Sequence, residues 1–154
     1  MPTDTTRRSL LETVAEQARH AGVFARVAVQ EAGLVCHAAD AAAHAEYRLG
    51  WENGRLWVSL VTPDRWLSES IEADLMHTGD DVEELLEEEL VEQGLEASRP
   101  VVEHFRSDDR LFTFRSPVSP EDADTAARWL LAYEACFRAL GDMQAGTDEN
   151  HQRT

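Results

Sequence analysis

Apolar residues in the first part of the chain recur at the spacing of a helix. Leu11, Val14 and Ala18 fall on one face when residues are placed at 100° intervals, as they do in an amphipathic α-helix. The segment Ser9-Leu10-Leu11-Glu12 has the spacing of a capping box, so a helix is expected to open there. Gly22 is expected to end this helix, because glycine readily adopts the left-handed conformation that follows helix C-termini.

From residue 23 to residue 63 the pattern changes to short apolar runs and alternation, which predict β-strands. The clearest turn is Asn53-Gly54, because both residues tolerate the positive φ angles of a two-residue type I′ hairpin. The strand that follows, Arg55 to Thr62, carries apolar residues on both sides. It is therefore expected to be central in the sheet with both faces covered, and Trp57 is expected to lie in the core.

Two helices are predicted after these strands. Asp64 can cap a helix that carries an apolar stripe, and Gly79 is expected to break it. The helix should resume from Asp80 as a very acidic segment with a narrow apolar stripe, and Gly94 should close it. The acidic residues at its start suit the positive end of the helix dipole. The apolar positions of the two segments are Trp66, Leu67, Ile71, Leu75, Val82, Leu85, Leu86 and Leu90.

The last third of the chain predicts a second hairpin and a long helix. Pro100 to Arg106 and Arg110 to Val118 read as two strands around the turn Ser107-Asp108-Asp109. The segment Ser119-Pro120-Glu121-Asp122 then supplies a cap, a proline and early acidic residues, which together start a helix. This helix is expected to run to about Ala145.

These elements predict an α+β fold with a twisted antiparallel sheet flanked by helices. The expected order is α-β-β-β-α-β-β-α, with five strands, or six if residues 23–43 add a short hairpin. Residues 1–145 are expected to form one domain, a size that can bury a real core. Residues 146–154 are polar and without periodicity, so they are expected to form a flexible tail.

The long C-terminal helix carries an unusually wide apolar arc. A helix that lies once against a sheet needs an apolar stripe of roughly 100°, whereas this arc covers about half the circumference. The surplus predicts either a homodimer or cover by another helix of the same chain, and the pattern does not choose between them. The residues expected at a dimer or partner interface are Trp129, Tyr133, Cys136, Phe137 and Leu140.

The net charge of the chain limits the classes of partner that it is expected to bind. Its 154 residues include 14 Lys and Arg against 30 Asp and Glu, which gives a formal net charge of -16. A field of that sign repels nucleic acid and anionic lipid, so direct nucleic-acid or membrane binding is not expected. The same field favours encounter with a basic partner protein, and it serves solubility equally well.

The chain offers little reactive chemistry. Cys36 and Cys136 lie far apart, without an apolar leader or a bilayer-length apolar run, so reduced thiols in the cytoplasm are expected rather than disulfides. No His or Cys pair has metal-ligand spacing, and no nucleophile or phosphate-loop motif is present. The chain is therefore expected to be no enzyme and to hold no metal or cofactor. The alternative is a metal-dependent enzyme or sensor that uses His77, Asp80, Asp81 and His104.

The order of elements resembles the YbjN-like family, which shares its fold with type III secretion chaperones. The resemblance rests on Asn53 to Leu60, the helix with Trp66 and Leu67, the strand Arg110 to Phe114, and Ser119-Pro120-Glu121 before the last helix. It covers nearly the whole chain. The chain departs from that pattern in the segment from Val23 to Ala43 and in the length of its acidic helix.

The resemblance implies a non-enzymatic protein-binding module, because secretion chaperones of this fold hold extended client segments on their surface. YbjN-like proteins are also loosely linked with stress responses and regulation. The leading hypothesis is therefore a homodimeric, chaperone-like or adaptor protein in the cytoplasm. The runner-up is an acidic protein that docks a basic nucleic-acid-binding protein and modulates it.

Overall fold

A computed structural model of the chain describes residues 4–39, 45–78, 81–95, 100–108, 110–138 and 140. Three predictions of the sequence fall outside these residues: the break at Gly79-Asp80, the end of the last helix near Ala145, and the tail 146–154. These three remain predictions.

The described residues form an α+β fold in which four helices flank one six-stranded antiparallel sheet. The strand order across the sheet is β1-β2-β3-β4-β6-β5. The fold class is as predicted, and the six-stranded alternative is the one observed, because residues 23–43 do contribute a hairpin. The elements are α1 (Asp4–Ala21), β1 (Phe24–Gln30), β2 (Gly33–Ala38), β3 (Glu46–Glu52), β4 (Arg55–Thr62), α2 (Arg65–Thr78), α3 (Val82–Glu92), β5 (Glu103–Arg106), β6 (Phe112–Pro117) and α4 (Ala123–Arg138).

Strand β4 lies in the interior of the sheet, as predicted, and joins its two halves. Strands β1 to β4 form a meander of neighbours along the chain, whereas β6 reaches the other side of β4 from much later in the sequence. The predicted hairpin between β3 and β4 is present, with φ angles of 54° at Asn53 and 78° at Gly54. Those two positive angles are the ones that a type I′ turn requires.

The helix starts show where local signals worked and where they did not. The Asp64 carboxylate accepts a hydrogen bond from the Leu67 amide at 3.2 Å, so it caps α2 as predicted. Helix α1 begins at Asp4 and not near Ser9. The prediction missed its first turn because that turn is polar and has no apolar period. The cap of α4 is Asp122, whose side chain accepts from the Thr125 amide at 2.8 Å, and not Ser119.

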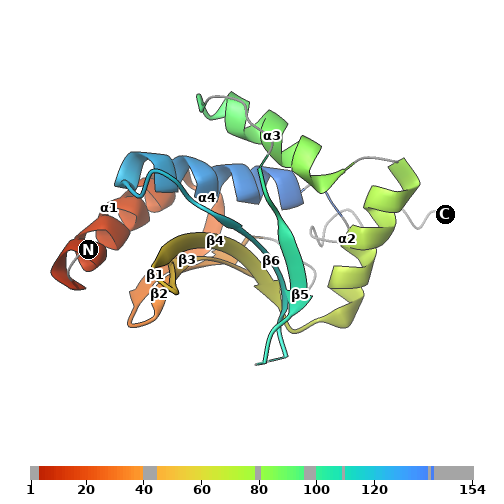
Figure 1. Cartoon of the computed structure of the whole chain (residues 1–154), viewed down its shortest axis with the longest axis horizontal. Helices are drawn as coiled ribbons and strands as arrows, with labels where there is room; N and C mark the ends of the chain where they lie inside the picture. The colour runs from red at the N-terminus through yellow and green to blue at the C-terminus, as the bar shows by residue number, and fades with distance from the viewer. Residues whose placement is uncertain are drawn as a thin grey trace.

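All the helices near the sheet lie on one side of it. Figure 1 shows α1 and α4 lying over one face of the sheet, with α3 above α4 and α2 beside the sheet. We call the face that α1 and α4 cover the inner face. No helix in the described part of the chain lies on the opposite face, which we call the outer face.

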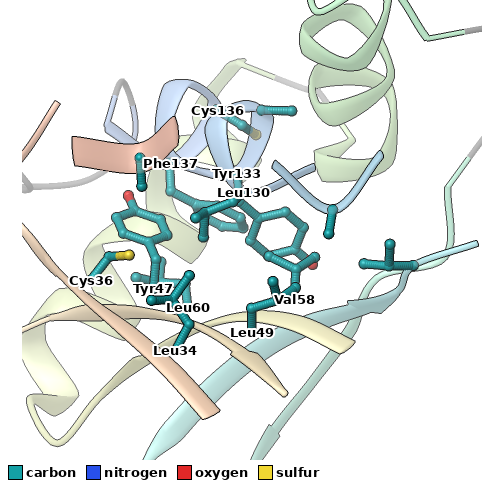
Figure 2. Packing of buried hydrophobic residues seen from close by; sticks show 14 of the residues in the cluster. Leu34, Cys36, Tyr47, Leu49, Val58, Leu60, Leu130, Tyr133, Cys136 and Phe137 are labelled. Carbon is teal, nitrogen blue, oxygen red and sulfur yellow. The ribbon is translucent and has the colours of Figure 1, made fainter. Parts of the chain in front are cut away.

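The inner face is the hydrophobic core. Tyr47 and Leu49 of β3, and Leu60 of β4, are at most 1% exposed and point toward α4 (Figure 2). Tyr133 and Phe137 of α4 meet them from above and are fully buried. Close packing of this kind across two layers is what stabilises a domain of this size.

The wide apolar arc of α4 is covered within one chain. Helix α4 contacts α1, α3, β3 and β4, and Tyr133, Cys136, Phe137 and Leu140 are between 0% and 6% exposed. Trp129 is half-buried and packs against the same core. The prediction that Tyr133, Cys136, Phe137 and Leu140 lie at a dimer or partner surface is therefore wrong, whereas for Trp129 it stays a prediction. The alternative, cover by other helices of the same chain, is observed because α1 and α3 flank α4 on both sides.

Candidate functional site: the outer face of the sheet

The outer face is built from side chains that lie in register across all six strands. One row runs from Val35 through Arg48, Ser59 and Arg115 to Glu103, each paired with the next across a strand boundary. The side chains of a strand alternate between the two faces of a sheet, so the buried partners of this row, such as Leu49 and Leu60, lie on the inner face. The expectation that both faces of β4 are covered therefore holds for the inner face only.

Arg115 organises one half of the outer face. Its guanidinium lies 3.9 Å from the ring centre of Trp57 and 5.0 Å from that of Phe105. It also donates to the carboxylates of Glu103, at 2.9 Å, and Glu52. Two aromatic faces and two carboxylates hold this side chain at 19% exposure, so it is a fixed platform and not a mobile surface cation.

Trp57 is part of this platform and does not lie in the core as predicted. It is half-buried on the outer face, where its indole NH donates to the Glu52 carbonyl at 3.2 Å. The alternation of Leu56, Trp57 and Val58 along β4 carried the necessary signal. The apolar character of the indole concealed it, because large apolar rings pair with arginine on sheet surfaces as readily as they enter cores.

Arg48 organises the other half. Its guanidinium donates twice to Glu46, at 3.0 and 2.8 Å, and His37 lies 3.9 Å from the same carboxylate group. The stems of such long side chains cover apolar residues beneath them. Val35, which pairs with Arg48, and Val61, which pairs with Glu46, are only 9% and 6% exposed.

Two shallow grooves meet on this face. One, of about 340 Å³, lies over the backbone at Gly33 and Gly50, where side chains are absent. The other, of about 550 Å³, lies beside the platform and is lined by Trp57, Phe105 and Arg115. Arg48 and Ser59 line both grooves, so the two grooves are neighbours on the sheet.

The glycines of the first groove are required by the fold itself. A Cβ at Gly33 would lie 2.5 Å from the Leu49 carbonyl oxygen, and one at Gly50 would lie 2.9 Å from the Ala32 carbonyl oxygen. Gly33 also has a φ of 148°, which side chains disfavour. The close approach of β2 to β3 thus leaves the floor of the groove without side chains.

The charge of the outer face differs from that of the whole chain. Its rows carry four arginines and three glutamates, whereas the whole chain has a formal net charge of -16. The charged residues of the outer face are Arg26, Arg48, Arg55, Arg115, Glu46, Glu52 and Glu103. By contrast, α3 presents exposed carboxylates at Glu84, Glu88 and Glu92 and contains no basic residue.

Neither cysteine is poised for chemistry. Burial raises the pKa of the Cys36 thiol to about 12, and it raises the pKa of the Cys136 thiol to about 12. Both cysteines are buried and unbridged. Since the thiolate is the reactive form, these thiols behave as small buried hydrophobes.

Of the four residues considered for a metal site, the structure describes the side chains of Asp81 and His104, and each is engaged elsewhere. Asp81 caps α3 by accepting from the Glu83 amide at 3.1 Å. His104 lies on β5, stacked 3.8 Å from Phe114, with its nitrogens 2.9 Å from the Thr113 carbonyl and 2.5 Å from the Glu72 carboxylate. The side chain of His77 and all of Asp80 lie outside the described residues. Within those residues, no group of three or more His, Cys, Asp or Glu side chains could hold a metal ion.

Among the helices described here, none is long and apolar enough to cross a membrane. No family model, no curated protein and no solved structure matches this chain.

Proposed function

We propose that this chain is a non-enzymatic protein-binding module that acts as a cytoplasmic homodimer, as a chaperone-like or adaptor protein with a link to stress responses. The observation that carries the proposal is the outer face, where a grooved surface of arginines and aromatic rings lies beyond the reach of the helices. Aromatic and arginine side chains are the residues enriched in protein interfaces. The two unbridged, buried thiols favour a reducing compartment.

A second copy of the chain is the occupant that the charges favour. Two molecules of net charge -16 repel each other across most of their surfaces. The outer face carries both signs of charge, and Arg55 lies opposite Glu52 in the pair of β3 and β4, so a two-fold arrangement can place Arg55 of one copy near Glu52 of the other. Docking through these faces also turns both acidic α3 helices outward, where their mutual repulsion is smallest.

A direct test replaces one exposed apolar residue of this face. Phe105 is 37% exposed on β5, and Val91 is 48% exposed on α3, on the other side of the molecule. We expect the natural chain to show twice the 17.3 kDa chain mass by light scattering. Phe105→Asp should reduce that mass to one chain, whereas the matched control Val91→Asp should leave it unchanged.

Each outcome of this test is informative. If the natural chain has the mass of one chain over a wide range of concentrations, the homodimer proposal is wrong. If Phe105→Asp remains a dimer, the outer face is not the interface. Thermal melting of each variant separates a lost interface from a lost fold, because a folded monomer still unfolds cooperatively.

The acidic helix α3 favours a second candidate function, the docking of a basic nucleic-acid-binding protein. Glu84, Glu88 and Glu92 recur every four residues on its exposed side, and like charges at this spacing destabilise a helix by about 0.2–0.5 kcal/mol per pair. A basic partner would relieve this repulsion. Binding to such a partner should weaken steeply with salt and in the triple Glu→Gln variant, and an affinity that is flat with ionic strength would exclude this function.

A further inference from the structure

A cleft of about 530 Å³ opens between the N-terminal half of α1 and the turn that joins β1 to β2. Its apolar lining comes from Leu11, Val29 and Trp51. Arg7 and Arg8 of α1, together with Gln30, supply polar groups to the lining. A volume of this size, with apolar walls and a few polar groups, is typical of sites for small molecules.

Arg7 is the unusual residue of the cleft. Its guanidinium lies 4.9 Å from the centre of the Trp51 ring. Its Nε is buried and has no hydrogen-bond partner among the described residues. Arg8, by contrast, lies at the rim with its Nε 3.1 Å from the Glu12 carboxylate.

A buried donor of a charged group without an acceptor is costly, because its lost hydration is not replaced. The chain has 30 acidic residues that could accept a hydrogen bond from a guanidinium. The lack of a partner for the Arg7 Nε is therefore unexpected. Most buried polar groups in native proteins have a partner, and an exception often marks a missing ligand, water or ion. The other charged residue that lines the cleft is Glu31, and because Arg8 is already paired with Glu12, Arg7 is the cation of the cleft with a donor left to satisfy.

We propose that this cleft binds a small organic anion with a planar or aliphatic body. An oxygen of its carboxylate, sulfonate or phosphate group would accept hydrogen bonds from Arg7, which satisfies the buried Nε. The body of the ligand would lie against the Trp51 ring, Leu11 and Val29. This site goes beyond the proposed protein-binding function, since α1 and Trp51 lie on the helical side of the sheet, and it borders the first groove of the outer face at Gln30, Ala32 and Gly33.

The test uses 8-anilinonaphthalene-1-sulfonate, a fluorescent anion with an apolar body, and N-phenyl-1-naphthylamine, which has nearly the same body without the charge. We expect the anion to bind with one molecule per chain and at least tenfold more tightly than the neutral probe. Arg7→Gln should weaken binding of the anion at least tenfold and leave that of the neutral probe within twofold. Arg65→Gln, at an exposed position at the start of α2, is the control and should change neither.

A second variant keeps the test valid if Arg7→Gln does not fold. Ala32 lines the cleft from the exposed turn between β1 and β2, so Ala32→Glu adds a negative charge there without entering the core. This variant should also weaken binding of the anion at least tenfold. The proposal is overturned if either folded variant binds the anion within twofold of the natural chain. It is equally overturned if the neutral probe binds as tightly as the anion.

Discussion

The two faces of the sheet both bury apolar side chains, but the surroundings of those side chains differ. On the inner face, apolar side chains such as Leu60 and Tyr47 are buried by a second layer, and the cover comes from α1 and α4. On the outer face, Val35 and Val61 are almost as well buried, yet they lie beside the charged side chains of Arg48 and Glu46 and not under a helix. The comparison shows that low exposure does not by itself identify a core.

The difference also separates stability from recognition. The inner face is held by burial of large apolar area, which is the dominant stabilising term in folding. The outer face is held by ion pairs and cation–π contacts, which contribute less and leave polar groups accessible to a partner. Mutations on the inner face should therefore affect unfolding, whereas mutations on the outer face should affect binding.

The largest expected difference in stability is between substitutions at two adjacent residues of β4. Leu60 is 1% exposed on the inner face, and Ser59 is half-buried on the outer face. Leu60→Ala should lower the free energy of unfolding by about 2–5 kcal/mol, because it leaves a cavity in the core. Ser59→Ala should change it by less than about 0.5 kcal/mol. Urea unfolding measures both, and equal effects would remove the distinction between the faces.

The next largest effect on stability is expected from loss of the Arg115 side chain, which makes the most contacts named on the outer face. Arg115→Met removes two ion pairs and two cation–π contacts while it keeps much of the apolar stem, so it should cost about 1–2 kcal/mol in urea unfolding. Arg55, which lies 5.3 Å from the Trp57 ring centre and is exposed, is the matched control. Arg55→Met should cost less than about 0.5 kcal/mol. A larger loss at Arg55 would show that the platform depends on a different cation.

Two buried tyrosines of the inner face should respond differently to loss of a hydroxyl group. The Tyr133 hydroxyl lies 2.6 Å from the Ser116 hydroxyl, whereas the Tyr47 hydroxyl has no partner among the described residues. Tyr133→Phe should therefore cost about 1 kcal/mol, and Tyr47→Phe should be neutral or stabilising. Thermal unfolding of the two variants distinguishes them, and a clear loss at Tyr47 would reveal a partner for its hydroxyl.

The smallest effect is a dependence on pH at Glu134 of α4. Burial raises the pKa of this carboxyl above its ordinary value, although Arg138 opposes the shift. The folded state then holds the proton more tightly than the unfolded state, so ionisation of Glu134 opposes folding and stability is lost as pH rises through the folded pKa. Glu134→Gln should gain stability relative to the natural chain as pH rises above about 4. A difference that is constant with pH would contradict this.

Local signals predicted much of the fold. Asn53-Gly54 placed a hairpin because two positive φ angles are a property of those residues alone. Asp64 similarly placed the start of α2, since a cap needs only the amides that follow it. The strand Arg55–Thr62 was predicted with its observed bounds and its interior position.

Contacts between elements that lie far apart in the sequence were not predicted. The apolar arc of α4 did not reveal that α1 and α3 would cover it, because periodicity gives the width of a face and not its neighbours. The row through Arg48, Ser59 and Arg115 exists only once β6 pairs with β4. Arg7 was not placed in a cleft, because the polar first turn of α1 has no apolar period to mark it as helix.

The position of α4 in the chain has a consequence for biosynthesis. Strands β1 to β4 are neighbours in sequence and can pair as soon as they leave the ribosome, but Leu130, Tyr133 and Phe137 are translated long afterwards. Until then the apolar inner face of the nascent β1–β4 meander is not covered by α4, and it is exposed to aggregation or to chaperones that bind unfolded chains. Cooperative folding of this chain therefore waits for its last described helix, and stalled translation products that stop short of α4 should be prime substrates for quality control.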